Sequence, residues 1–229
     1  MALNRVQTID DHVKVKTALV SVWDKSGLDL LVSGLLAAVP DVRILSTGGT
    51  HGAIQKILGP GGRARLQQIS EYTGQPEMQG GLVKTLDFKV YLGILSETYN
   101  TAHNADMARA GAVPIDLVVV NLYPFGTVVA QPGATPEAAR SNIDIGGPCM
   151  VRAAAKNFHR VAVLTDPADY QPVLAELSAG RGALTLATRW RLAQKAFAVT
   201  AAYDAAICGY LAQLAPERVR ADYDVRTGS

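Results

Sequence analysis

The sequence is poor in cysteine: its 229 residues include only Cys149 and Cys208. The two lie far apart, and neither belongs to a C-x-x-C pair or to a Cys/His cluster with the spacing of metal ligands. This pattern argues against a disulfide framework and against a structural zinc site. Because disulfides belong to oxidising compartments, their expected absence predicts a reduced, cytoplasmic location.

Net charge and long apolar runs are also lacking. The formal charge of +2 arises from 22 basic and 20 acidic residues, too balanced for a chain that binds nucleic acid mainly by charge. No apolar run reaches the roughly 18 residues of a membrane span. Near the N-terminus, Asp10 and Asp11 stand where a signal peptide would have its apolar region. We therefore expect neither nucleic acid nor membrane as a partner, and any anion must be met by local groups.

No linker and no internal repeat divides the chain, and 48% of its residues are hydrophobic. A chain of this length and composition has enough apolar residues for one sizeable core. We predict a polar leader over 1–15, a single domain over 16–218 and a charged tail over 219–229.

Strand patterns alternate with helix patterns along the chain. Residues 16–23, 42–47, 115–122 and 160–165 are β-branched and apolar over a strand's length. Helical spacing of apolar residues follows over 28–39 and 48–58, and one long helix is predicted over 184–214. In the last strand-to-helix turn, Asp166 is predicted as the N-cap and Pro167 as the first helical residue. The alternation predicts an α/β fold with a mostly parallel sheet flanked by helices.

Polar residues gather where these strands end, and in a parallel sheet such ends share one edge, where ligands collect. The first strand runs into Lys25, the second into "STGGT" (46–50), and the third into Asn121 and Tyr123. A glycine turn at the start of a helix can bind a phosphate. More often, however, such a turn only connects a strand to the helix that follows it. Taken alone, Lys25 is better explained as an ordinary solvated turn residue, and Tyr123 as a residue at the edge of the core.

Two further segments place charged groups beside glycine pairs. "GGLVKTLDFKVYLGIL" (80–95) contains Lys84 and Thr85, and predicts either a polar site or an amphipathic helix with a snorkelling lysine. "SNIDIGGPCMVRAAAKN" (141–157) brackets a helical stretch with Asp144 and Lys156. A lysine that reaches back along the helix would leave a gap suited to a nucleotide base. Alternatively, Asp144 caps the helix and Lys156 complements its negative end.

Together these segments resemble the IMP cyclohydrolase domain of the bifunctional purine biosynthesis enzyme that also carries an AICAR transformylase. The matching stretches occur in family order over nearly the whole chain, and they are "SVWDKSGL", "LSTGGT", "ISEYTGQPEMQGGLVKTL", "IDLVVVNLYPF", "NIDIGGPCMVRAAAKN", "VAVLTDPADY" and "RLAQKAFAVTAAYDAAI". The resemblance implies a methylglyoxal-synthase-like α/β fold with C-terminal helices. It also implies ring closure of the nucleotide FAICAR to IMP with loss of water, without a metal or redox cofactor. The transformylase half is not part of this sequence, so a stand-alone cyclohydrolase is expected; a homodimer and a separate transformylase are left open as partners.

The same resemblance implies roles for individual residues. The candidate catalytic residues are Lys156, as proton donor and acceptor, with Asp144, Lys84 and Tyr123. The candidate substrate-binding residues are Lys25, Thr47, Gly48, Gly49 and Thr50 for phosphate and ribose, Thr85 beside them, Asn121 at the base, and Ile145 at the reacting end.

Four positions depart from the family pattern: Trp23 replaces a serine, Leu82 an arginine, and Asp87 and Tyr91 two histidines. Because the altered positions include neighbours of the expected phosphate site, we keep a catalytically inactive nucleotide-sensing module as an alternative. Methylglyoxal synthase, or another lyase acting on a small phosphorylated substrate, is disfavoured by the specific "VKTL" and "NIDIGG" matches.

Overall fold

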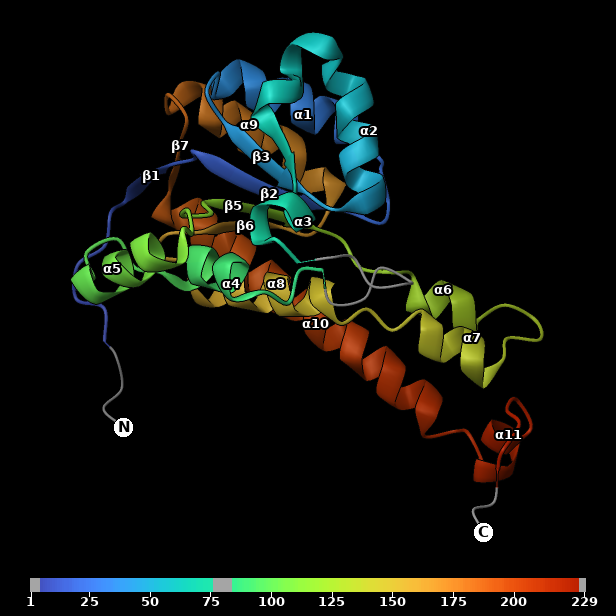
Figure 1. The fold of residues 1–229 in the computed structure, drawn as a ribbon. Helices are drawn as coiled ribbons and strands as arrows, with labels where there is room; N and C mark the ends of the chain where they lie inside the picture. Colours follow the sequence, from blue (N-terminus) through green and yellow to red (C-terminus); the bar gives the residue numbers. More distant parts are fainter. Residues whose placement is uncertain (1–4, 76–83, 227–229) are drawn as a thin grey trace.

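The computed structural model describes residues 5–75 and 84–226 of the chain. In this part, five strands form one parallel sheet in the order β4-β3-β2-β5-β6 (Figure 1). The predicted parallel α/β sheet is thereby confirmed. The strands are β2 (Thr17–Ser21), β3 (Arg43–Ser46), β4 (Leu66–Gln68), β5 (Leu117–Val120) and β6 (Ala162–Leu164).

Helices cover both faces of this sheet (Figure 1). One layer consists of α1 (Leu28–Ala38), α2 (Gly48–Leu58) and α9 (Tyr170–Ala179). The other consists of α4 (Phe88–Leu95), α8 (Gly146–Lys156) and α10 (Leu186–Leu211). With helices on both faces, the central strands are buried on both sides, which explains why residues 115–122 form a nearly continuous apolar run.

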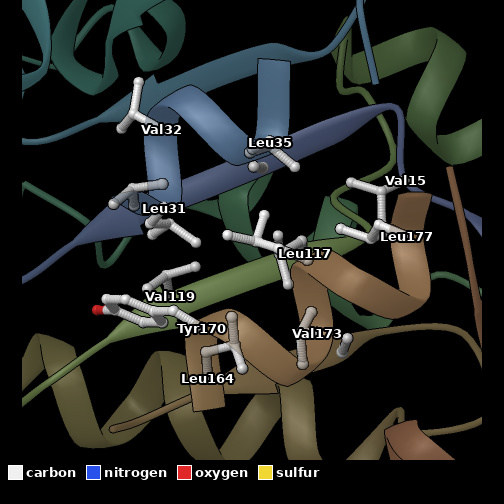
Figure 2. Packing of buried hydrophobic residues seen from close by; sticks show 14 of the residues in the cluster. Val15, Leu31, Val32, Leu35, Leu117, Val119, Leu164, Tyr170, Val173 and Leu177 are labelled. Atoms are coloured by element: carbon white, nitrogen blue, oxygen red, sulfur yellow. The ribbon is translucent and has the colours of Figure 1, made fainter. Parts of the chain in front are cut away.

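The core is therefore split into two clusters by the sheet. Along β5, Leu117 and Val119 face the α1 and α9 layer, whereas Val118 and Val120 face the α4 and α8 layer. This alternation follows from the two-residue repeat of a strand. Figure 2 shows the first cluster, in which side chains of α1 and α9 close over β5.

Shorter elements connect the layers. Asp166 accepts a hydrogen bond from the Ala168 amide (2.9 Å), which confirms it as the cap, although Pro167 begins a short 3-10 turn before α9. No helix within the described residues has the length and apolar character to cross a membrane. The remaining helices are α3 (Ile69–Thr73), α5 (Thr101–Ala110), α6 (Phe125–Val129), α7 (Pro136–Ser141) and α11 (Pro216–Arg220), with 3-10 turns η1 (Pro60–Arg65) and η3 (Pro167–Asp169).

The long C-terminal helix differs from the prediction at both ends. Instead of running over 184–214, α10 begins at Leu186 and ends at Leu211, and Ala183–Thr185 forms strand β7. Thr185 ends the strand because its side chain accepts from the Thr188 amide, while its own amide and hydroxyl donate to the Glu176 carboxylate. Sequence periodicity alone could not separate a three-residue strand from the helix that follows it.

The partner of β7 is β1 (His12–Lys14), which pairs with it antiparallel. Ordered structure thus begins upstream of residue 16, inside the segment predicted as a polar leader. At the other end, α11 spans the predicted boundary at residue 218. The predicted domain limits remain predictions, but β1 lies within the predicted leader and α11 crosses the predicted start of the tail.

Candidate active site

A cavity of about 250 Å³ opens at the carboxyl edge of the sheet, beyond the ends of β2, β3 and β5. Most of the predicted site residues line it, although they come from segments more than a hundred residues apart. Its walls include Lys25, Thr47, Gly49, Thr50, Lys84, Thr85, Asn121, Tyr123, Asp144 and Ile145, together with Trp23. The expected gathering of strand-end residues is therefore found in the structure.

One side of the cavity is formed by the first turn of α2. Thr47 precedes this helix and makes no side-chain cap hydrogen bond, so the first amides have no side-chain acceptor at that position. Gly48 adopts a positive φ of 30°, and a Cβ atom built there would lie 2.9 Å from Lys84 Nζ. Gly48 thus leaves room for an ammonium group beside a helix N-terminus, an arrangement that suits an anion.

The two threonines of "STGGT" contribute less than expected through their hydroxyls. Thr50 Oγ1 donates to the Val22 carbonyl (2.9 Å) and accepts from the Val22 amide (3.1 Å). Its only proton is therefore unavailable to a phosphate. Thr47 Oγ1 lies 2.7 Å from Ser21 Oγ, and this pair shares one of its two protons. The threonines fix the α2 turn to β2, and the backbone of the turn is what faces an anion.

The loop after β2 is held by Lys25 and Asn121. Lys25 Nζ donates to the carbonyls of Val22 and Trp23, and desolvation lowers the pKa of Lys25 while the charge of Asp24 opposes the shift. Asn121 Oδ1 accepts from the amides of Trp23 (2.6 Å) and Asp24 (3.0 Å), and its Nδ2 donates to the Asp24 carbonyl (2.8 Å). Both side chains position the loop as well as lining the cavity.

Asp144 occupies the opposite side, at the start of α8. Its Oδ1 accepts from the Gly147 amide (2.8 Å), so the capping role expected from sequence is present. Burial raises the pKa of Asp144, and hydrogen bonds from the Gly147 and Tyr123 amides pull in the other direction. Tyr123, 40% exposed, has a pKa raised first by burial and then by the charge of Asp144, which places the two side chains in one electrostatic environment.

The glycine pair 146–147 is required by close contacts. A Cβ atom at Gly146 would lie 2.5 Å from Thr85 Oγ1, and one at Gly147 would lie 2.5 Å from Asp144 Oδ2 and 2.8 Å from a Leu122 methyl. Any side chain at either position would displace a wall of the cavity. The pair therefore allows the start of α8, Thr85 and Asp144 to converge.

Lys156 does not join this group. It is the last residue of α8, exposed, and about 15 Å from Gly146 along the helix axis at 1.5 Å per residue. The following residue, Asn157, donates to the carbonyls of Ile94 and Ser96. Lys156 therefore lies toward the amino edge of the sheet, and the idea that it reaches back over α8 to the base is not supported by the structure.

Tyr203 is a site residue that the sequence analysis missed. Its hydroxyl accepts from the Asp144 amide (2.9 Å) and donates to the Asn142 carbonyl (3.1 Å), and its ring packs edge-on against Phe125. Tyr203, which lies in α10, thus fixes the backbone of Asp144, one of the candidate catalytic residues. The sequence offered one signal for this role, a tyrosine among alanines in "TAAYDAA". Its hydrogen-bond partner Asp144 lies 59 residues away, so the pairing could not be predicted from the local pattern.

The four departures from the family pattern fall in different places. Trp23 lines the cavity. Asp87 caps α4 by accepting from the Lys89 amide (2.8 Å). Tyr91 is partly buried beside Cys149, and burial raises the pKa of its hydroxyl. Leu82 lies outside the described residues. Among the three described departures, the one that borders the cavity is Trp23.

Comparisons with known proteins agree with this architecture. Residues 31–149 match the MGS-like domain family, and residues 154–227 match the family described as AICARFT/IMPCHase bienzyme. The chain is 51% identical to the bifunctional purine biosynthesis protein PurH of Sorangium cellulosum over 203 residues, 89% of this chain and 37% of the relative. It is 49% identical to the protein of the same name from Magnetococcus marinus over 201 residues, 88% of this chain and 36% of the relative.

A solved structure supports the same grouping. The crystal structure of ForH superimposes with a TM-score of 0.72 at 35% identity, covering 86% of this chain and 99% of ForH. The chain spans a little over a third of the length of the PurH relatives, but nearly the whole of ForH. The chain belongs to the MGS-like domain family, as the relative of the corresponding part of the AICARFT/IMPCHase bienzymes.

Proposed function

We propose that this chain catalyses the IMP cyclohydrolase step of purine biosynthesis, closing FAICAR to IMP with loss of water. The observation that carries the proposal is the cavity in which the partly buried Asp144 faces the same space as Lys84 and the first turn of α2. The names of the PurH relatives support a role in purine biosynthesis, and the family description supports this particular step.

Binding follows from the two ends of the cavity. The nucleotide phosphate would lie at the first turn of α2, where backbone amides and the Lys84 ammonium favour an anion. The base would then extend toward Tyr123, which follows β5, and Asp144, at the start of α8. A reaction within one molecule gains most from being held in a reactive conformation, so this two-ended grip is itself a source of rate.

The chemistry requires two proton movements. As the carboxamide nitrogen attacks the formyl carbon, it loses a proton, and Asp144 is the carboxylate placed to accept it. The raised pKa of Asp144 makes it a stronger base than an exposed aspartate. The proton that Asp144 accepts is passed on to the former formyl oxygen, which becomes a hydroxyl. The hydroxyl then leaves as water with the proton of the former formamide nitrogen, which forms the new C=N bond of the ring. Lys84, Tyr123 or the amides at the start of α8 can stabilise negative charge on that oxygen.

The test is IMP formation from FAICAR by the purified chain, followed by absorbance, with Asp144→Asn as the variant. We expect the substitution to lower kcat by about 100-fold or more, as for loss of a general base, while IMP binding stays within a few-fold. Asp106→Asn, a change to a surface carboxylate on α5 paired with Arg109, is the matched control and should leave kcat unchanged. Equal rates for Asp144→Asn and the parent chain would refute the assignment.

A catalytically inactive nucleotide-sensing module is the second candidate. The observation that favours it is Lys156, the residue that the resemblance assigns as proton donor, which lies away from the cavity. A sensor would bind IMP, measurable by calorimetry, and form none from FAICAR under any condition that supports binding.

A further inference from the structure

Trp23 lines the cavity of the candidate site. It follows β2, which lies between β3 and β5 in the sheet. The loop that follows β3 forms the anion-binding side of the cavity, and the segment that follows β5 carries Tyr123. A side chain at the end of β2 therefore sits between the part of the cavity that suits a phosphate and the part that holds Asp144.

Hydrogen bonds hold the backbone of Trp23 at both its amide and its carbonyl. The amide donates to Asn121 Oδ1 (2.6 Å), and the carbonyl accepts from Lys25 Nζ (3.1 Å). The side chain nevertheless remains exposed: 53% of the residue is accessible, although it lines the cavity. An exposed indole on a rigid support presents a large flat apolar surface at little further loss of conformational entropy on binding.

A second exposed aromatic side chain borders the same cavity. Tyr123 is 40% exposed, and it leaves the end of β5, the direct neighbour of β2 with Ser21 opposite Val120. Two aromatic side chains from adjacent strand ends, both open to one hollow, fit a flat ring that packs against them. Apolar surface of this kind, left exposed at a polar cavity, points to a ligand with a flat apolar face.

We propose that Trp23 determines ligand specificity by stacking its indole on the heterocyclic base of the bound nucleotide. This inference rests on the proposed function for the nature of the ligand, a purine ribonucleotide. The indole recognises the base rather than the phosphate, and it supplements the hydrogen-bonding groups of the cavity with contact area.

The first experiment uses tryptophan fluorescence. The chain has two tryptophans, and the other, Trp190, packs edge-on against Phe158 near the C-terminal end of α8, so Trp190→Phe leaves Trp23 as the only reporter. We expect IMP to quench the emission of this variant, because a stacked base contacts the indole directly. Ribose 5-phosphate, which has the anion and the sugar but no base, should bind more weakly and leave the emission unchanged at saturation. An equal change with both ligands would overturn the proposal, because the contact would then be with the phosphate or sugar.

The second experiment compares variants by calorimetry. Trp23→Ser should weaken IMP binding about ten-fold, the order expected for losing one base-stacking contact. Trp23→Phe should retain most of the affinity, and ribose 5-phosphate should bind both variants within about two-fold of the parent. Trp190→Ala is the matched control for removing an indole and should leave IMP affinity unchanged. Undiminished IMP affinity in Trp23→Ser would refute the proposal.

These outcomes separate the inference from the function on which it rests. IMP that quenches Trp23 in a chain without FAICAR turnover would support stacking and refute the cyclohydrolase. Turnover of FAICAR by a Trp23→Ser variant with parental KM and IMP affinity would support the enzyme and refute stacking. If IMP bound to no form of the chain, both would be refuted.

Discussion

Both edges of the central sheet carry charged groups, but these groups are buried as a pair at the amino edge and border a cavity at the carboxyl edge. At the amino edge, Asp116 and Arg160 are 7% and 5% exposed, and they pair at 2.9 Å. Asp116 also accepts from the amides of Lys16 and Thr17, and Arg160 donates to the carbonyls of Gly93, Ile94 and Ser96. At the carboxyl edge, Asp144 and Lys84 face a cavity of about 250 Å³.

The difference distinguishes a structural pair from a functional site. Buried charges are tolerated when partners satisfy them, and the Asp116–Arg160 pair is surrounded by such partners on β2, α4 and the turn after it. The pair and its hydrogen bonds connect segments that lie far apart in the sequence. At the carboxyl edge, Asp144 and Lys84 border a cavity, which is the arrangement expected where a ligand supplies further partners.

The largest predicted effect concerns the amino edge. Asp116→Asn leaves the buried Arg160 guanidinium without its negative partner, and we expect a loss of about 3–5 kcal/mol in the free energy of unfolding. Urea unfolding followed by circular dichroism measures it. Asp106→Asn, which removes the partner of the exposed Arg109, should change stability by less than about 1 kcal/mol. Similar small losses in both variants would remove the contrast between the two edges.

Replacing a glycine by alanine should have opposite effects on stability in α8 and in α10. Gly147→Ala forces a methyl group against Asp144 and Leu122, and we expect a loss of about 1–3 kcal/mol in stability together with lower turnover. Gly209→Ala, within α10, meets nothing within 4 Å and should stabilise the chain by roughly 0.5–1 kcal/mol. Thermal unfolding of both variants under the same conditions makes the comparison. A stable, fully active Gly147→Ala variant would show that the glycine pair is not needed for the site.

Burial raises the pKa of both Asp144 and Asp116, but Asp116 is paired with Arg160, so removing the charge should affect stability differently at the two positions. Burial raises the pKa of Asp144 in the folded chain, so its contribution to stability is present at low pH and is lost as the pH rises through that pKa. Asp144→Asn removes the charge but keeps an acceptor for the Gly147 amide. At pH 7 we expect it to match or exceed the parent in stability, by up to about 1 kcal/mol, with the difference shrinking toward pH 4. Urea unfolding at the two pH values tests this, and a marked loss of stability at pH 7 would class Asp144 with Asp116.

Much of the fold and part of the site followed from the sequence, for identifiable reasons. Apolar runs such as 115–122 and the alternation with helical spacing specify a parallel sheet, and a parallel sheet brings its strand ends to one edge. Long-range contacts between short segments could not be predicted in this way. The pairing of β1 with β7 joins residues about 170 apart, and Tyr203 reaches Asp144 from another helix. The engagement of the Thr50 hydroxyl with β2 likewise depends on coordinates that a local pattern does not contain.

The comparison of Lys84 with Lys156 provides the smallest expected effect and the sharpest test of the resemblance. The family pattern assigns proton transfer to Lys156, whereas in this chain Lys84 and Lys25 line the cavity, and Lys25 Nζ is already engaged by the carbonyls of Val22 and Trp23. Lys84→Ala should therefore lower turnover by at least about ten-fold through loss of charge stabilisation, and Lys156→Ala should change kcat by less than about three-fold. Both are measured in the FAICAR assay, with IMP affinity as the check on folding. A loss of orders of magnitude in Lys156→Ala would mean that the lysine acts through a contact that a single copy of the chain does not make, and the catalytic group would then have to be sought at the amino edge as well.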